Sequence, residues 1–389
     1  MLYEPGQFEP LIDEPWDPAR VEAAIAAIVA DVDEAFDPEA LWPEHEWDAG
    51  DAPLPLKNLY VGASGVIWAL DALRRRGQAE TSLDLPTAAL RSLELFRAEP
   101  DVEPGETHYH PAALFLGEAG PLLVAFRLAP DAALAADLHA LLPTSAENPT
   151  DDVNWGIPGA LLALLALHEW TGESRWAEAA RESAAVLRDR RGEDGLWRQD
   201  DDYRGFGTLH GAAGNTLALL RVEPDETLAG ETAAALARHA VREDGLANWP
   251  GAAGRPLRRP RDGRICLQWC TGAPGILAGS WDYLDDELLL AGAELVWQAG
   301  AHGDEKGHGL CHGTSGNGFA LLKAFARTGD ERWLARARCF AVHALVQAER
   351  IAATNGRRRY SLFTGDVGTA LFAAACVDLD LRYPVVDLL

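Results

Sequence analysis

The chain has 389 residues, and 48% of them are apolar, which is enough to bury a large hydrophobic core. It carries 60 acidic and 34 basic residues, so its formal net charge is −26. Because so acidic a surface repels phosphate groups, we expect no binding to nucleic acid and no docking on anionic membranes.

The chain begins with a predicted N-terminal arm, residues 1–19. Its start has neither a basic stretch nor an apolar core like that of a secretory leader, so we expect a cytoplasmic protein. A first helix is expected over Val21–Phe36, where apolar residues recur at three- and four-residue steps. Similar amphipathic stretches with a wide polar face follow at Arg175–Leu187, Glu231–Val241 and Trp333–Val346.

A second kind of helical stretch, mostly apolar, follows the pattern G-x-x-G. This pattern occurs seven times, with its first glycine at positions 62, 117, 156, 211, 272, 313 and 365. Self-similarity of this kind is typical of repeat architectures. The longest apolar run, at residues 159–167, is too short to span a membrane. No convincing period-2 alternation occurs, so strands should be minor.

Buried helices that alternate with half-exposed ones can close into two concentric rings. We therefore predict an all-α fold, an α/α toroid with seven inner and seven outer helices. The toroid would span about residues 20–389, and the whole chain, 1–389, would form a single domain. Glycines would allow tight turns and close packing where the inner helices begin. An open helical solenoid is the alternative, but the similar apolar inner helices favour closure.

Alignment of the repeats on their first glycine places cysteines and histidines at shared positions. Cys270 and Cys311 each stand two residues before that glycine, and His210 and His312 each stand one residue before it. Equivalent positions in a ring face the same end of its axis. Two thiols and two imidazoles should therefore converge at one mouth of the toroid.

Two cysteines and one histidine are a known set of three zinc ligands that leaves a fourth position for water or substrate. Cys270, Cys311 and His312 are the candidate ligands of one Zn²⁺. A buried pair of free cysteines is an alternative. A closed structural site with Cys266 as fourth ligand is another. Cys339 and Cys376 lie within apolar helical stretches and are expected in the core.

An open zinc site of this kind can bind an incoming thiol and lower its pKa. Transfer of the thiol to a carbon electrophile then needs an acid, for which His210 is the candidate. Asp152 stands four residues before the glycine of its repeat and should lie near the same mouth. The alternatives are a core histidine for His210 and a solvated loop carboxylate for Asp152.

These residues resemble the lanthionine synthetase C-like family, which comprises the zinc-dependent cyclases of lanthipeptide biosynthesis and their eukaryotic relatives. The resemblance runs from about residue 59 to residue 368 and is carried by WCTGAPG (269–275), LCHGTSGN (310–317), LHGAAG (209–214), DVNWGIPG (152–159) and SLFTGDVG (361–368). It implies a double ring of seven inner and seven outer helices with zinc at Cys270, Cys311 and His312. It further implies that His210 is the acid/base residue and that Asp152 is the active-site aspartate.

The resemblance also implies a reaction. In the cyclases, a peptide cysteine adds to dehydroalanine or dehydrobutyrine and forms a thioether ring. In the eukaryotic relatives, zinc activates glutathione for addition to dehydroamino acids, and a lysine assists phosphate elimination. KGHGLCHG (306–313) is similar to their sequence, so Lys306 is a candidate catalytic residue. The expected partners are a dehydrated peptide or protein, or glutathione, with dehydration supplied by a separate kinase/lyase or dehydratase.

Two positions depart from the pattern of the cyclases. Cys266 and Thr271 stand where the cyclases usually carry an arginine and a tyrosine, which puts enolate stabilisation by those side chains in doubt. A non-catalytic module that binds zinc and a thiol on the same scaffold is therefore a second interpretation. A sugar-active helical toroid is a third, but it would leave Cys270, Cys311 and His312 without a role.

Overall fold

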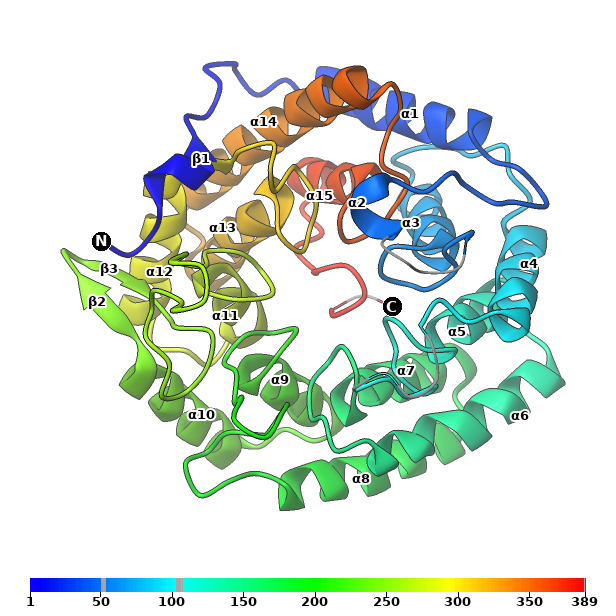
Figure 1. The fold of residues 1–389 in the computed structure, drawn as a ribbon, viewed down its shortest axis with the longest axis horizontal. Coiled ribbons are helices and arrows are strands. Elements are labelled where there is room, and N and C mark those ends of the chain that lie inside the picture. Colours follow the sequence, from blue (N-terminus) through cyan, green and yellow to red (C-terminus); the bar gives the residue numbers. More distant parts are fainter. Residues whose placement is uncertain (50–53, 103–105, 107, 388) are drawn as a thin grey trace.

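The structure, a computed structural model, describes residues 1–49, 54–102, 106, 108–387 and 389. Within these residues, fifteen α-helices make up most of the regular structure, and the strands are few and short. Fourteen of the helices lie in two concentric rings (Figure 1). The predicted all-α class is therefore confirmed. No helix in the described part of the chain combines the length and the apolar character needed to cross a bilayer.

The inner ring consists of seven helices, each of which follows a G-x-x-G glycine: α3 (Ala63–Arg75), α5 (Ala119–Leu128), α7 (Ile157–Thr171), α9 (Ala212–Val222), α11 (Ala273–Ser280), α13 (Thr314–Thr328) and α15 (Asp366–Asp378). The outer ring also has seven: α1 (Pro18–Glu34), α4 (Leu85–Ala98), α6 (Ala132–Leu141), α8 (Ser174–Asp189), α10 (Glu226–His239), α12 (Asp286–Ala299) and α14 (Glu331–Asn355). Helix α15 packs against α3, and α1 packs against α14 and α15. Both rings are thus closed, as predicted, and the open solenoid is wrong.

Short elements connect and cover the rings. They are the 3₁₀ helices η1 (Pro5–Gln7) and η2 (Leu142–Glu147), the helix α2 (Glu46–Ala49), and the strands β1 (Phe8–Glu9), β2 (Val241–Glu243), β3 (Leu246–Asn248) and β4 (Ala301–His302). Strand β1 pairs with β4 and β2 pairs with β3, both antiparallel. The N-terminal arm is thereby fastened to the segment that follows α12.

Two local predictions need correction. The helix expected over Glu231–Val241 ends at His239, and Val241 begins the β2–β3 hairpin. Its turn is Asp244–Gly245, with φ angles of 52° and 80°, the left-handed conformation that a two-residue hairpin turn requires. Cys376 is buried as expected, but Cys339 is only half-buried because it lies on α14, an outer helix with an exposed side.

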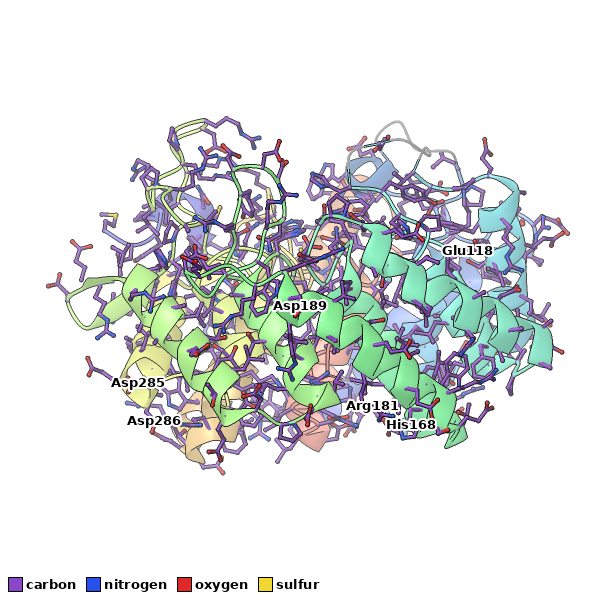
Figure 2. All side chains as sticks on the ribbon, turned by 90° about the horizontal axis from the view of Figure 1, so that it is seen from below. Glu118, His168, Arg181, Asp189, Asp285 and Asp286 are labelled. Atoms are coloured by element: carbon purple, nitrogen blue, oxygen red, sulfur yellow. The ribbon has the colours of Figure 1, made fainter. Side chains whose placement is uncertain are left out.

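Inner and outer helices run in opposite directions. In Figure 2, Glu118 lies just before α5 near the end of the ring where long loops project, whereas His168, in the last turn of α7, lies at the opposite end. Asp285 and Asp286, at the start of α12, also lie at that opposite end. The starts of the inner helices therefore gather at the end with the long loops.

The second glycine of each repeat lies in the first turn of its inner helix, where a side chain has no room. A Cβ atom there would overlap the carbonyl oxygen of the residue six positions earlier, in the pairs Gly65–Leu59, Gly120–Leu114, Gly159–Val153, Gly214–Thr208, Gly275–Trp269, Gly316–Leu310 and Gly368–Leu362. Each entering loop therefore folds back tightly over the helix that it begins. The G-x-x-G pattern is the sequence signature of this close approach.

Candidate metal centre

The loops that enter the inner helices are joined by backbone hydrogen bonds between equivalent repeat positions. The amide of Cys270 donates to the carbonyl of Cys311 (3.3 Å), and the amide of Cys311 donates to the carbonyl of Phe363 (2.7 Å). Phe363 donates in turn to Tyr60 (3.1 Å), and Tyr60 to Phe115 (3.2 Å). All five residues stand two positions before the first glycine of their repeats. The shared register seen in the sequence is thus a set of direct contacts in the fold.

Cys270, Cys311 and His312 form a cluster at this end of the ring. One ligand atom from each lies within 4.8 Å of the others, and Cys311 Sγ lies 3.5 Å from His312 Nε2. Both cysteines are buried, and His312 is half-buried. Ligand atoms around a tetrahedral zinc ion lie roughly 3.5–3.8 Å apart, so the donor atoms and their spacing fit Zn²⁺. Cys266 is not part of the cluster.

The two sulfur atoms differ in protonation when no metal is bound. A hydrogen bond from the Cys311 thiol lowers the pKa of Cys270 well below its ordinary value, and His312 and His210 lower it further against the effect of burial. Burial and the nearby Cys270 sulfur raise the pKa of Cys311. Within the pair, the surroundings of Cys270 favour its thiolate, the form that binds a metal, more than those of Cys311 do.

Further polar groups hold the sulfur atoms. Gln268 Nε2 donates a hydrogen bond to Cys270 Sγ (2.9 Å), and the Thr271 hydroxyl lies 3.8 Å from the same atom. The Tyr60 hydroxyl acts to lower the pKa of Cys311, against the larger effect of burial, and the Tyr60 ring stacks on Phe363 at 5.1 Å. Sequence reasoning assigned no role to Gln268 or Tyr60. Tyr60, like Cys270 and Cys311, stands two residues before the first glycine of its repeat. This shared position could have identified Tyr60 as a neighbour of the cysteines.

Asp152 and His210 form a pair. His210 Nδ1 lies 2.7 Å from Asp152 Oδ2, and Asp152 Oδ1 accepts a hydrogen bond from the Trp155 amide (2.8 Å). Asp152 is buried, whereas the His210 side chain is 30% exposed. Burial lowers the pKa of His210, but the Asp152 carboxylate and the Cys270 sulfur together raise it above its ordinary value. Because Nδ1 faces Asp152, Nε2 is the nitrogen that can serve a substrate.

Two more ionisable groups stand near the cluster. Burial and the charges of Cys270 and Cys266 raise the pKa of Tyr203 to about 12, and its hydroxyl donates to the Gly251 carbonyl (2.9 Å). Burial also raises the pKa of Cys266, although Arg259 and, to a smaller extent, Lys306 act to lower it. Tyr203 lies in a different repeat from Cys270 and outside the five sequence motifs, so sequence reasoning did not predict that it lies near the cluster.

A cavity of about 710 Å³ opens beside the cluster of Cys270, Cys311 and His312. Its lining includes His312, Lys306 and Tyr60, so Lys306 and a candidate ligand line the same cavity. His210 and Asp152 are not among the residues that line this cavity. Of the predicted site residues, Lys306 and His312 therefore line this cavity, whereas His210 and Asp152 do not.

The short helix α2 forms part of the cavity wall through Trp47 and Asp48. Asp48 makes a buried ion pair with Arg359 (Oδ2 to Nε, 2.6 Å) and accepts a hydrogen bond from the Thr364 hydroxyl (2.9 Å). The Arg359 guanidinium also lies 5.5 Å from the centre of the Trp47 ring. Sequence reasoning missed these residues because 311 positions separate Asp48 from Arg359 and no pattern links them.

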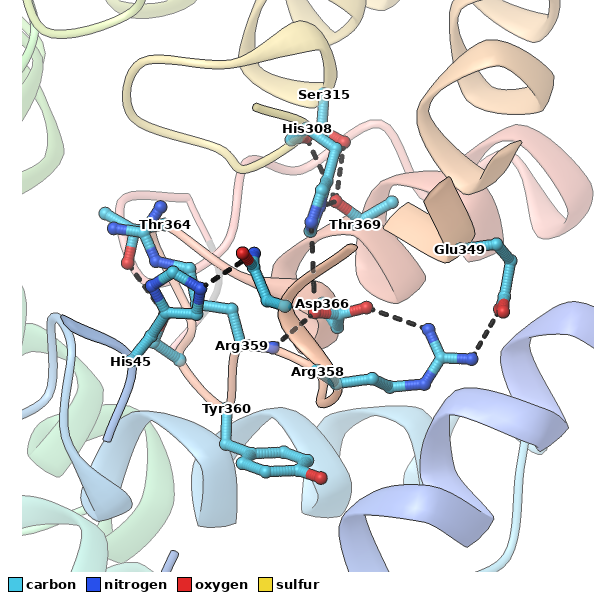
Figure 3. Close-up of polar contacts among 12 residues, drawn as sticks. His45, His308, Ser315, Glu349, Arg358, Arg359, Tyr360, Thr364, Asp366 and Thr369 are labelled. Carbon is cyan, nitrogen blue, oxygen red and sulfur yellow. Dashed lines mark hydrogen bonds and ion pairs between the residues drawn. The ribbon is translucent and has the colours of Figure 1, made fainter. Parts of the chain in front are cut away.

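A buried polar network supports the loop that carries Cys311 (Figure 3). His308, three residues before Cys311, places Nε2 3.8 Å from Asp366 Oδ2. Asp366 Oδ1 accepts a hydrogen bond from Arg358 (2.9 Å), which also pairs with Glu349 on α14. Burial lowers the pKa of His308, despite the opposing effect of Asp366. The loop is thus tied to both an inner and an outer helix.

A family model described as "Lanthionine synthetase C-like protein" matches residues 56–388. The chain belongs to the lanthionine synthetase C-like family. Glutathione S-transferase LANCL1 of Danio rerio is 33% identical over 119 residues, 28% of either chain. LanC-like protein GCL1 of Arabidopsis thaliana is 28% identical over 149 residues, 36% of this chain and 31% of its own. The chain therefore aligns with less than a third of the length of each of these curated relatives.

Among solved structures, this LanC-like chain is similar to nisin cyclase. The TM-score is 0.57 at 15% sequence identity, over 92% of this chain and 94% of that one. At this identity the likeness establishes the shared fold, an α/α toroid. The family membership inferred from the five motifs is confirmed by the family match.

Proposed function

We propose that this LanC-like protein is a Zn²⁺-dependent enzyme that adds thiols to dehydroalanine or dehydrobutyrine residues and forms lanthionine-type thioethers in a peptide. The convergence of Cys270, Cys311 and His312 within 4.8 Å carries the proposal. One Zn²⁺ bound there would lower the pKa of an incoming thiol and favour its thiolate. Lys306, on the cavity side of His312, would orient the substrate or neutralise its charge.

The proposed addition forms one bond and consumes one π bond. The thiolate sulfur bonds to the β-carbon of the dehydro residue, and the electron pair of the C=C bond moves toward the carbonyl group. The α-carbon then needs a proton, which His210 Nε2 would donate while Asp152 holds Nδ1. The Asp152 carboxylate raises the pKa of His210, which favours the protonated form that the proposed acid needs. The proton released by the thiol restores His210 and balances the reaction.

A second candidate is the addition of glutathione to dehydroamino acids in a protein. Two observations favour it. One matched relative carries the name glutathione S-transferase. The cavity beside His312 also contains the Lys306 ammonium group, which suits an anionic thiol. In either case the dehydrated residue would come from a separate kinase/lyase or dehydratase.

The metal centre is tested by the zinc content of protein purified under reducing conditions. We expect one zinc per chain in the wild type and none in Cys311→Ala. Cys376→Ala is the matched control, because Cys376 is equally buried but lies outside the cluster. A wild-type protein that binds no zinc, even after addition of the metal, would rule out the proposed centre.

The reaction is tested with a peptide that contains both dehydroalanine and cysteine, with and without glutathione. Cyclisation removes the free thiol without a change in mass, whereas glutathione addition increases the peptide mass by one glutathione. His210→Ala should keep its zinc but catalyse neither cyclisation nor glutathione addition. Normal turnover by this variant would show that His210 is not the acid. Zinc binding without either reaction in the wild type would favour the non-catalytic module.

A further inference from the structure

The segment that follows α15 turns back into the ring and ends inside it (Figure 1). Tyr383, Val385 and Val386 are buried there without belonging to any helix. Asp387 fastens the segment by ion pairs to Lys323 Nζ on α13 (2.6 Å) and to Arg221 on α9. The inner helices therefore enclose this segment of their own chain, residues 383–387, which we call the plug.

The plug holds a strained backbone conformation. Val385 has a φ of 65°, in the left-handed region that β-branched residues rarely adopt. Such a conformation persists only where the surrounding contacts enforce it. The Asp387 carboxylate accepts a hydrogen bond from the Tyr383 amide (2.7 Å), and the Asp387 amide donates to the Tyr383 carbonyl (2.8 Å). The turn between these two residues thus fixes the position of the Tyr383 side chain.

Tyr383 is fully buried and contacts two entering loops at once. Its ring stacks on Trp269, with 4.7 Å between ring centres and an angle of 8° between ring planes. Its hydroxyl donates a hydrogen bond to the Leu310 carbonyl (2.9 Å). Phe319 packs against the ring at 4.8 Å. The side chain is therefore confined by apolar contacts and by one directional bond.

Both contacts end on the residues directly before the two cysteines of the metal cluster. Trp269 precedes Cys270, and Leu310 precedes Cys311. Burial and the nearby sulfurs of Cys311 and Cys270 raise the pKa of the Tyr383 hydroxyl, which agrees with a position close beneath the thiols. One side chain from the plug thus bridges the two loops that supply the sulfur ligands.

We propose that Tyr383 is a positioning residue that sets the separation of Cys270 and Cys311 for metal binding. The proposal rests on the proposed zinc centre. Without the hydroxyl, the Leu310 carbonyl loses a buried hydrogen bond and the Cys311 loop can shift relative to the Cys270 loop. Groups that orient metal ligands typically change the metal affinity by about 10–100-fold when they are removed.

The test compares Tyr383→Phe with Thr232→Val in the full-length protein. Thr232→Val removes a buried hydrogen bond of similar kind, from Thr232 to Thr216 (2.9 Å), between an outer and an inner helix. Zinc affinity is measured by competition with a chelator, ligand geometry by the absorption spectrum of bound Co²⁺, and stability by thermal unfolding of the metal-free protein. We expect Tyr383→Phe to bind zinc about tenfold more weakly and to shift the cobalt bands, and Thr232→Val to do neither.

Tyr383→Leu, which also loses the stack on Trp269, should weaken zinc binding more than Tyr383→Phe. Wild-type affinity and an unchanged cobalt spectrum in both Tyr383 variants would overturn the proposal. Equal weakening of zinc binding in Tyr383→Phe and Thr232→Val would also overturn the proposal. Loss of any buried hydrogen bond, through its effect on stability, would then explain the weaker zinc binding. Failure of the wild type to bind zinc would instead disprove the centre itself, so the two failures are distinguishable.

Discussion

Nδ1 of His210 lies 2.7 Å from Oδ2 of Asp152, although 58 residues separate them. The two residues stand at the entrances to the adjacent inner helices α9 and α7. The buried carboxylate fixes the orientation of the imidazole and places a proton on Nδ1. Packing of neighbouring repeats therefore builds this acid/base pair.

Replacement of Asp152 by asparagine should lower the pKa of His210. The carboxylate is the larger of the two groups that raise this pKa, and the opposing effect of burial would remain. NMR titration of the metal-free protein measures the midpoint, with the exposed His139 on α6 as an internal control. An unchanged His210 midpoint would contradict the proposed pairing.

The same pair makes stability depend on pH. The pKa of His210 in the folded protein exceeds the ordinary value of 6.5. The contribution of His210 to the free energy of unfolding is therefore fully present below pH 6.5. This contribution is lost as the pH rises through the folded pKa. Denaturation of metal-free wild type and Asp152→Asn should therefore show a stability difference that shrinks toward alkaline pH. A constant difference would show that the charge on His210 does not contribute.

Two glycine substitutions should have opposite effects on stability. In Gly275→Ala the new Cβ would overlap the Trp269 carbonyl oxygen, so we expect a loss of about 1–3 kcal/mol in the free energy of unfolding. Gly230, within the outer helix α10, is exposed, and a Cβ atom added there would meet no neighbouring group within 4 Å, so Gly230→Ala should gain about 0.5–1 kcal/mol. Urea denaturation measures both changes, and equal effects would contradict the packing described for the repeats.

Removal of zinc should lower the melting temperature of the wild type. A ligand present at 100 times its dissociation constant stabilises a fold by about 2.7 kcal/mol. Cys311→Ala, which lacks one of the three proposed ligands, should melt at the same temperature with zinc and with a chelator. A zinc-dependent melting temperature in Cys311→Ala equal to that of the wild type would mean that the metal binds elsewhere.

Asp387→Asn should destabilise the plug, because it leaves the buried Lys323 and the neighbouring Arg221 without their shared counter-charge. Loss of one partner of a buried ion pair costs about 3–5 kcal/mol. Asp286→Asn is the control, since Asp286 is exposed and pairs with Arg327 at the surface, where ion pairs contribute about 0–1 kcal/mol. Similar losses in the two variants, measured by urea denaturation, would contradict the anchoring role of Asp387.

Asp387 should also make the fold sensitive to acid. Burial raises the pKa of its carboxyl group, but Lys323 and Arg221 together lower this pKa by more, to a net value below 3.8. Its stabilising contribution is therefore complete above pH 3.8 and is lost as the pH falls through the folded pKa. Asp387→Asn should lack this loss. A parallel acid dependence in wild type and variant would show that another group is responsible.

The sequence by itself determined the toroid and the convergence of the three candidate ligands. Each inner helix begins with the same close approach between a glycine and a carbonyl oxygen, and this requirement recurs as G-x-x-G. Because every repeat has the same local geometry, position relative to the glycine predicted that Cys270, Cys311 and His312 would meet. The same register placed Asp152 near the mouth that holds His210, and the family resemblance gave each residue its role, but their direct contact is known only from the structure.

Only the tertiary structure decided the contacts made by irregular segments. The path of the plug that places Tyr383 under the cysteines, and the contact of Asp48 on α2 with Arg359, have no periodic signature in the sequence. Lys306 was found by motif, but its place in the cavity beside His312, apart from His210, depends on how the loops fold over the ring. Such contacts join residues distant in the chain, and they form only once the two rings have closed.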